Sequence, residues 1–153
     1  MITRLARETD IPRIAAVSRA YYDEIAFGPL VGIFEEEHAA DMLAACNGPD
    51  SVLIVTQAHG KIIGVIYAII LRTTFYQRKI AVAQEIILHT DPELSPFRRI
   101  KIMSELVALA DKHLREKGAI LSAMGTRLKA GATGRLLEKQ GYTATGLQWH
   151  KEL

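Results

Sequence analysis

Three apolar segments without strict alternation constrain the fold more than any other feature of this 153-residue chain. They span residues 51–57, 61–71 and 79–88, and β-branched residues are frequent in them. Strands that are apolar at nearly every position are buried on both faces of a sheet. A His-Gly pair at 59–60 predicts a hairpin between the first two, and the polar residues 73–78 are expected to connect the second to the third. We therefore expect a central sheet with helices on both faces.

Amphipathic segments supply these helices. Thr9 or Asp10 is the expected N-cap of the first, with Pro12 in its first turn. A second begins near Glu35 and stops at Asn47, before a Gly-Pro pair. Two more are expected over residues 96–117, ended by glycine, and over residues 131–140. The apolar stripe of the helix over 96–117 is expected to contain Phe97, Ile100, Met103, Val107, Ala110 and Leu114.

Shorter strands complete the pattern at residues 1–6 and 119–124, with two more within 142–153. The element order is then β-α-α-β-β-β-α-β-α-β-β. This order combines an antiparallel meander with a strand-helix-strand crossover, which predicts a mixed, mostly antiparallel α/β sheet. No linker or repeat interrupts the chain, so residues 1–153 are expected to form a single domain.

Composition excludes several classes of protein. The net charge of +2 and the lack of an aromatic-basic platform argue against nucleic-acid binding. The histidines lack metal-ligand spacing, so no metal site is expected, and His89 is placed in the loop after the third long strand. A single cysteine, Cys46, is interpreted as a packing residue. With no apolar span or signal segment, these features predict a cytoplasmic protein that does not enter membranes, and they leave a homodimer open.

Four phrases, taken in order, resemble the GCN5-related N-acetyltransferase (GNAT) superfamily over essentially the whole chain. They are ITRLARETDIPRIAAVSRAYY, VLIVTQAHGKIIGVIYAII, LREKGAILSAM and GRLLEKQGYTATGLQWHKEL. The ending LLEKQGY…WHKEL is also similar to acetyltransferase-like proteins of bacteriophages. The resemblance implies a GNAT-like fold and transfer of an acetyl group from acetyl-CoA to a primary amine on a small molecule or a protein.

The same resemblance implies a CoA-binding loop of the form Arg/Gln-x-x-Gly-x-Gly/Ala at the start of the helix over 96–117. Amides at a helix N-terminus bind pyrophosphate, and glycine lets the backbone approach it. Here the glycines are absent, and two registers fit. A leading Arg98 puts Lys101 and Met103 at the glycine positions, whereas Arg99 puts Ile102 and Ser104 there. The implied cofactor-binding residues are Arg98, Arg99, Ile100, Lys101, Ile102, Met103 and Ser104.

An alternative reading of this stretch stays open. Ser95 is a good N-cap and Pro96 a good first helical residue. A helix capped in this way uses amides that a phosphate needs, and the arginines then form a solvated face.

Glu85 is the only acidic residue of the third long strand and is the candidate general base. The alternative is that it pairs with a basic neighbour or faces solvent at a strand edge. The resemblance further implies that an amide of this strand, at Ile87 or Leu88, polarises the thioester carbonyl. It places Leu137 where the family often has a tyrosine that acts as the general acid and protonates the leaving thiolate. In this chain, water or Thr133 has to supply that proton.

Three functions follow from these observations. The first is an acyl-CoA-dependent N-acetyltransferase. The second is a catalytically silent GNAT-like module that binds proteins, and the third is a basic nucleic-acid-binding domain. Binding of acetyl-CoA separates the first from the other two.

Overall fold

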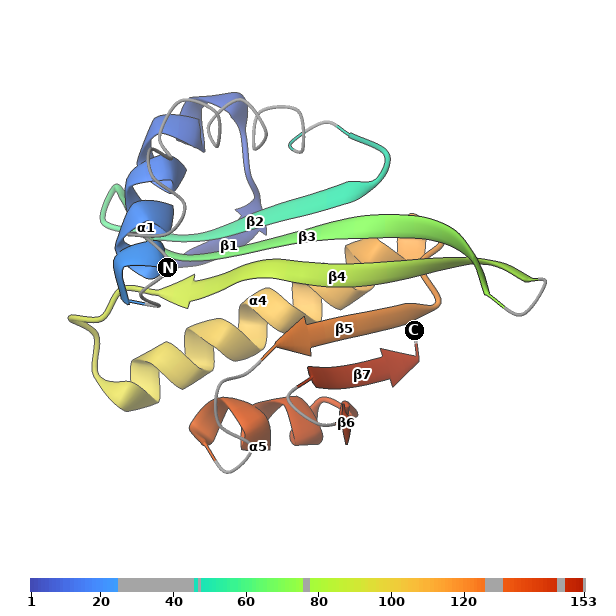
Figure 1. Ribbon diagram of the computed structural model, residues 1–153. Coiled ribbons are helices and arrows are strands. Elements are labelled where there is room, and N and C mark those ends of the chain that lie inside the picture. The colour runs from blue at the N-terminus through green and yellow to red at the C-terminus, as the bar shows by residue number, and fades with distance from the viewer. Residues whose placement is uncertain (25–45, 47, 76–77, 126–130, 146–147, 153) are drawn as a thin grey trace.

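The protein is described by a computed structural model, which defines the backbone of residues 1–24, 46, 48–75, 78–125, 131–145 and 148–152. Figure 1 shows a twisted sheet with helices packed against it. The elements are β1 Ile2–Leu5, a 3-10 turn Glu8–Asp10, α1 Ile11–Glu24, β2 Ser51–Ala58, β3 Lys61–Phe75, β4 Arg78–Thr90, α4 Pro96–Glu116, β5 Leu121–Gly125, α5 Ala132–Lys139, β6 Thr143–Thr145 and β7 Gln148–Glu152.

The sheet has seven strands in the order β1-β2-β3-β4-β5-β7-β6. Neighbouring strands are antiparallel except β4 and β5, which are parallel and are connected through α4. A parallel pair requires such a crossover connection. The predicted mixed, mostly antiparallel α/β sheet is therefore confirmed.

The two long hairpins differ in how well the sequence predicted them. His59 and Gly60 have φ values of 48° and 77°, as the two-residue turn between β2 and β3 requires. The predicted polar connection over 73–78 is wrong, because β3 continues to Phe75 and β4 begins at Arg78. Threonine and aromatic residues favour strands, and here the cross-strand partner outweighs their polarity.

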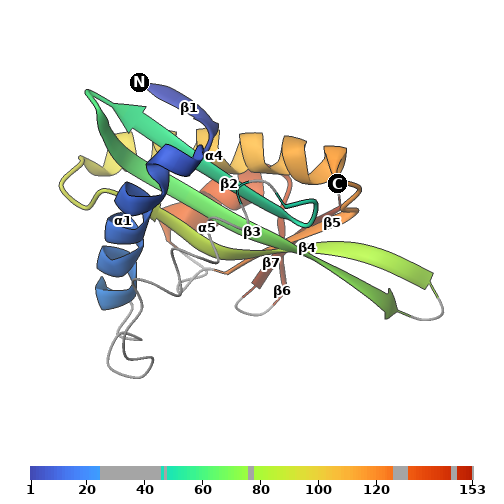
Figure 2. The same cartoon turned by 90° about the horizontal axis from the view of Figure 1, so that it is seen from above.

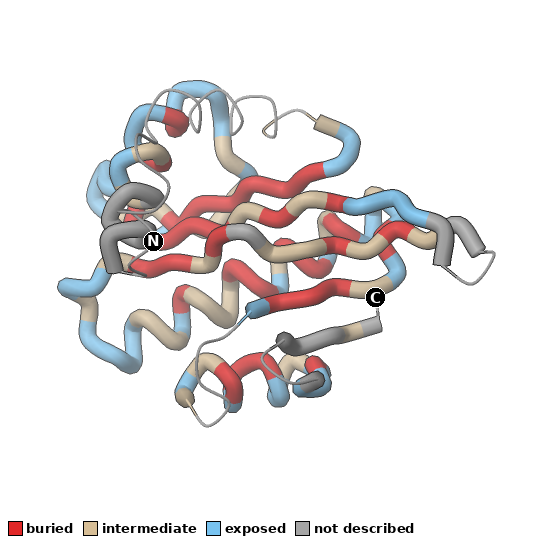
Figure 3. The backbone as a smooth tube through the Cα atoms, in the orientation of Figure 1, coloured by how far each residue is buried: buried red, intermediate tan, exposed pale blue. Residues whose placement is uncertain are grey.

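Helices cover both faces of the sheet, as expected. Seen from above, α1 lies on one side of the sheet and α4 on the other (Figure 2). The buried strand residues form a red band between the helices in Figure 3. The α4-side core includes Val52, Ile54, Ile66, Ala83, Leu106, Val107, Met124 and Leu137. The α1-side core consists of Ile11, Ile14, Leu53, Val55, Ile62, Val65 and Ile87.

The apolar stripe of α4 was predicted correctly only in its second half. Val107, Ala110 and Leu114 are buried, but Phe97 is 81% exposed. In the first half the core residues are Ile102 and Leu106, which the prediction did not include. Helical spacing alone fits both sets, and only the sheet selects the face that packs.

The start of α1 also differs from the prediction. Asp10 does not cap this helix from outside, because its carboxylate accepts from the Arg7 amide at 2.8 Å and from the Arg4 guanidinium at 2.7 and 3.1 Å. These bonds close the 3-10 turn before α1, and the Arg4 hydrogen bond is the main reason that the pKa of Asp10 is lowered.

Some predictions fall in or beside segments that the structure leaves undefined. The second predicted helix, from Glu35 to Asn47, lies almost entirely outside the described residues. Cys46 is half-buried against the α1-side core, which confirms its packing role. Across the described ranges, no helix combines the length and apolar character that crossing a membrane requires.

We expect Gly64→Ala to destabilise the fold. A Cβ at position 64 would lie 2.6 Å from Cγ2 of Ile102 and 3.2 Å from Cδ1 of Leu106, so α4 would have to move away from β3. Overpacking of this kind costs about 1–3 kcal/mol, measurable as a loss of unfolding free energy in urea.

The matched test is a double-mutant cycle with Ile102→Ala. Removing the Ile102 side chain makes room for the new methyl group, so the two substitutions together should cost less than the sum of each alone. Strict additivity would contradict a direct clash.

Candidate active site

A β-bulge interrupts the pairing of β3 and β4 within β4. Ala68 pairs with Glu85, but the preceding residue of β3, Tyr67, pairs with Ile87. One residue of β4, Ile86, is therefore extra. A bulge bends its strand and re-aims the neighbouring side chains, and bulges are common next to active sites.

The parallel strands β4 and β5 separate at the same point. Their register runs from Val82–Leu121 to Gln84–Ala123 and ends there. Glu85 is the next residue of β4, so it directly follows the last pair of this register. Figure 1 shows the two strands diverging toward the arrow end of β4. Beyond it, the edge of β4 that faces away from β3 has no described strand partner.

Glu85 reaches across this divergence. Its Oε2 accepts a hydrogen bond of 3.2 Å from the backbone amide of Gly125, the last residue of β5. Glu85 as a whole residue is half-buried. Burial of its carboxyl group raises the pKa of Glu85 to about 7, and the hydrogen bond from the Gly125 amide opposes this rise. In the part of the chain that the structure describes, a backbone amide, and no basic side chain, binds this carboxylate.

Ile87 and Leu88 follow on the same strand. Ile87 is fully buried in the α1-side core, and Leu88 packs against the α4-side core. Their side chains thus fix β4 between the two helical layers. The role of their amides in binding the thioester carbonyl stays a prediction.

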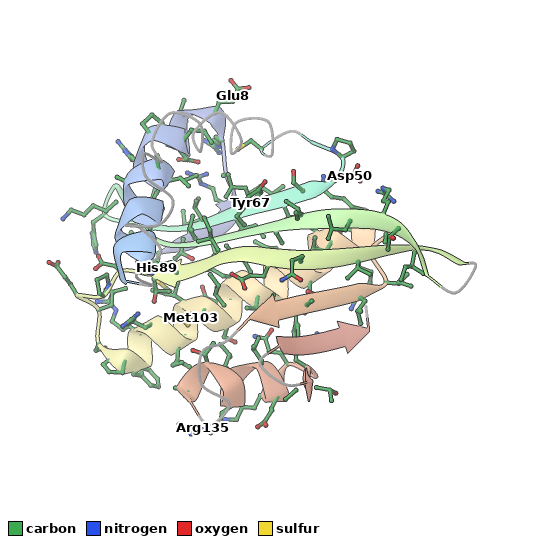
Figure 4. All side chains as sticks on the ribbon, viewed as in Figure 1. Glu8, Asp50, Tyr67, His89, Met103 and Arg135 are labelled. Carbon is green, nitrogen blue, oxygen red and sulfur yellow. The ribbon has the colours of Figure 1, made fainter. Side chains whose placement is uncertain are left out.

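His89 is not the loop residue that was expected. It is the penultimate residue of β4 and is 3% exposed. Figure 4 shows it at the arrow end of the strand. The strand was predicted to end at Leu88, two residues before its actual end at Thr90.

The N-terminus of α4 has the cap that was left open as an alternative. Ser95 accepts from the Arg98 amide through Oγ at 3.5 Å and from the Arg99 amide through its carbonyl at 3.0 Å, and Pro96 is the first helical residue. A bond of 3.5 Å is long for N–H···O, so it is weak. The first turn therefore offers the Phe97 amide and a loosely held Arg98 amide to a ligand.

The basic side chains of this turn separate into two groups. Arg98 and Lys101 are exposed, whereas Arg99 is half-buried and donates from Nε to Thr90 Oγ1 at 3.1 Å. Arg99 therefore connects α4 to the end of β4. Arg98 and Lys101 remain on the surface, where an anion can reach them.

Apart from the exposed Lys101, the second turn of α4 packs toward the protein interior. Ile102 is buried against β3, and Ile100 is half-buried. Ser104 accepts two hydrogen bonds of 2.9 Å from Nε2 of Gln140, one through its carbonyl and one through Oγ. Both predicted registers thus place one of their glycine-equivalent positions, Met103 or Ser104, between α4 and α5.

Thr133 and Leu137, which were considered for the protonation of the leaving thiolate, both lie on α5; Thr133 is half-buried and Leu137 is buried. Leu137 is fully buried in the α4-side core. Thr133 directs its Oγ1 toward Sδ of Met103 at 4.0 Å, a weak contact between α5 and α4. Figure 4 labels Met103 on α4, above α5. The structure therefore gives Leu137 and Thr133 packing contacts, and a role for either in binding CoA stays a prediction.

A buried polar cluster was not predicted from the sequence. We call Asp111, Ser122, Tyr142 and Lys151 the Tyr142 cluster. The Tyr142 hydroxyl lies 2.5 Å from Asp111 Oδ1 and 3.0 Å from Ser122 Oγ, and Lys151 Nζ donates to Asp111 Oδ2 at 2.8 Å. A carboxylate only accepts, so the tyrosine donates to Asp111 and accepts from Ser122.

Burial and the adjacent Asp111 carboxylate raise the pKa of Tyr142, so the phenol is neutral at physiological pH. One signal in the sequence pointed to this cluster. Asp111 lies among Val107, Ala110 and Leu114, on the apolar stripe of α4, where a charge needs a buried partner.

Solved structures share this architecture. An acetyltransferase of the GNAT family from Streptococcus pneumoniae superposes with a TM-score of 0.76, covering 99% of both chains at 12% identity. The chain has the fold of the GNAT acetyltransferases. An aminoglycoside 6'-acetyltransferase type Ii matches with a TM-score of 0.71 at 19% identity, over 99% of this chain and 97% of that one.

A ribosomal-protein-alanine N-acetyltransferase from Brucella melitensis also matches, with a TM-score of 0.71 at 20% identity over 100% of both chains. No protein-family model matches the sequence. No curated protein matches it either. At identities this low the likeness concerns the fold, and the site has to be argued from its own geometry.

Proposed function

We propose that the protein is an N-acetyltransferase that moves the acetyl group of acetyl-CoA to a primary amine. The observation that carries the proposal is Glu85, a carboxyl group with a pKa raised to about 7 at the divergence of β4 and β5 in a GNAT fold. A base with a pKa near the working pH is well suited to remove a proton from an alkyl ammonium.

The chemistry assigned to Glu85 involves two proton losses from the acceptor nitrogen. The acceptor ammonium loses its first proton to Glu85, directly or through water, and the free amine nitrogen forms a bond to the thioester carbon. The carbon–sulfur bond then breaks, its electron pair leaves with the CoA sulfur, and the nitrogen gives up its second proton to solvent water to become the amide. A thiol has a pKa of about 8.5, so the thiolate leaves readily without the tyrosine that Leu137 replaces.

The first turn of α4 is suited to bind the phosphates of CoA, with fewer backbone amides than a glycine-rich loop offers and with basic side chains in addition. The Phe97 amide and the weakly held Arg98 amide point out of the helix N-terminus, where the helix dipole favours an anion. The exposed side chains of Arg98 and Lys101 supply positive charge for the phosphates, in place of the close backbone approach that glycines would allow. Arg99 contributes mainly by fixing the helix to Thr90.

A silent protein-binding relative is the second candidate, and the Ser95 cap favours it. A serine and a proline at this helix start reduce the number of amides that a pyrophosphate can use. Cytoplasmic location, suggested by the single cysteine, and the identity of the acceptor stay predictions under both candidates.

Acetyl-CoA binding tests the proposal first. At about 100 times its dissociation constant, acetyl-CoA should raise the free energy of unfolding by roughly 2.7 kcal/mol, seen as a higher melting temperature. Arg98→Ala should weaken binding by about 1.5–3 kcal/mol, the value of a charge-assisted hydrogen bond. Arg115→Ala, an exposed arginine in the last turn of the same helix, is the control and should leave binding unchanged.

Transfer is then assayed on a panel of amines. It includes an aminoglycoside and a peptide that begins with alanine, because two of the fold neighbours carry those names. Absence of binding at millimolar acetyl-CoA would refute the proposed acetyltransferase function. Binding without transfer to any amine would favour the silent relative.

A further inference from the structure

The position of the Gly125 amide depends on how β5 is held from behind. On the side of β4, β5 has strand pairing only as far as Gln84–Ala123. On its other side it pairs with β7 along its whole length, from Leu121–Glu152 to Gly125–Gln148. The end of β5 that donates to Glu85 is therefore paired with β7, and its contact with β4 is the Gly125–Glu85 hydrogen bond.

The Tyr142 cluster is a second polar connection between β5 and the rest of the fold, besides the backbone pairing of β5 with β4. Ser122 on β5 is in register with Lys151 on β7, and both contact the Tyr142–Asp111 pair. Asp111 belongs to α4, which packs on β2, β3 and β4. The cluster thus ties β5 and β7 to the helix that also supports the strand of Glu85.

We propose that Ser122 and Tyr142 are positioning residues for Glu85, because their hydrogen bond fixes β5 so that the Gly125 amide stays on the Glu85 carboxylate. The effect on rate rests on the proposed function of Glu85 as base. The physical claim concerns the Glu85–Gly125 contact and is measurable without any turnover.

The charged and titratable groups near Glu85 allow a clean measurement. β5, residues 121–125, carries no titratable side chain, and the register partner of Glu85 on β3 is Ala68, preceded by the titratable Tyr67, which pairs with Ile87. The Tyr142 cluster supplies the phenol, the Asp111 carboxylate and the Lys151 ammonium. Since the phenol is neutral, replacing Ser122 or Tyr142 removes no charge. Glu85 is one of the groups that raise the pKa of Tyr142, so Ser122→Ala, which leaves the phenol in place, is the variant whose effect on Glu85 reports a change in geometry.

The test is Ser122→Ala, with Tyr142→Phe as a second variant that removes the same bond from its other end. We expect the Glu85 pKa, titrated by carbon NMR of its carboxyl group, to rise by about 0.5–1 unit as the Gly125 amide withdraws. Exchange of the Gly125 amide hydrogen with solvent should become about tenfold faster, as expected for a loosened hydrogen bond.

Gln140→Ala is the matched control. Gln140 makes two hydrogen bonds to Ser104 that join α5 to α4 without touching β5, so its loss should leave the Glu85 pKa and Gly125 exchange as in the wild type. An unchanged Glu85 pKa in both folded variants would overturn the proposal, and so would equal shifts in Gln140→Ala.

The outcome also separates the two proposals. If Ser122→Ala shifts Glu85 while Glu85→Gln keeps full activity, the positioning is correct and the assignment of the base is wrong. If Glu85→Gln abolishes activity and Ser122→Ala leaves the Glu85 pKa unchanged, the assignment of Glu85 as the base is supported and the positioning role of Ser122 is refuted.

Discussion

Glu85→Gln should lower kcat/KM for acetyl transfer by about 10²- to 10⁴-fold, the usual contribution of a general base. Glutamine keeps the shape of the side chain and can still accept from the Gly125 amide, but it cannot take up the proton of the ammonium. The control is Glu105→Gln on α4, a half-buried glutamate that accepts from Thr3 away from the site. Equal activities of the two variants would remove Glu85 from the mechanism.

The pH profile carries the same information. Because the pKa of Glu85 lies at about 7, the wild-type kcat/KM should fall below that pH as the carboxylate is protonated. The Glu85→Gln variant should lack this acidic limb. An acidic limb that persists unchanged in the variant would have to come from another group.

Folding stability should respond to Glu85 in the opposite sense. The pKa is raised from 4.5 to about 7 on folding, so the folded state binds this proton more tightly than the unfolded chain does. The stability due to the neutral carboxyl is therefore complete below about pH 4.5 and is lost as the pH rises to about 7. Glu85→Gln should consequently be more stable than the wild type at pH 8, which denaturant unfolding measures without any assay of activity.

Asp111→Ala should be the most destabilising single change that we predict, with a loss of about 3–5 kcal/mol. The carboxylate is 4% exposed and binds both the Tyr142 hydroxyl and the Lys151 ammonium. Its removal leaves the buried hydroxyl without its acceptor and the ammonium without its counter-charge. Equilibrium unfolding in guanidinium chloride measures the loss.

Asp50→Ala is the control for this prediction. Asp50 also forms an ion pair: its carboxylate accepts from Arg72 Nε at 2.7 Å, but about half of each side chain is exposed. Solvent screens such a pair, so its loss should cost about 0–1 kcal/mol. Similar losses for Asp111→Ala and Asp50→Ala would show that the Tyr142 cluster contributes no more than a surface ion pair.

The fold was predictable because local patterns and long-range packing agree in most of the chain. The apolar strands, the His59–Gly60 turn and the serine cap of α4 each specify their own element through nearby residues. The order of those elements then admits few topologies, and the GNAT architecture is the one observed. The resemblance to this superfamily is thus confirmed at the level of the fold.

The candidate site was predictable only in part. Glu85 was identifiable as a lone acid in an apolar strand, but its hydrogen-bond partner on β5 lies 40 residues further along the chain. The cofactor residues were assigned as one continuous stretch. The structure divides that stretch, with Arg98 and Lys101 on the surface and Ile102 in the core, because successive residues of a helix face different directions.

By itself, the sequence determined the elements, their order and the presence of a charge on strand and helix faces that are otherwise apolar. Tertiary structure alone decided what those charges meet. Asp111 and Glu85 are both acids in apolar segments, yet among the described residues one binds Tyr142 and Lys151 while the other accepts from the Gly125 amide. Hydrophobic periodicity is a property of neighbours along the chain, whereas the environment that sets a pKa comes from residues that only folding brings together.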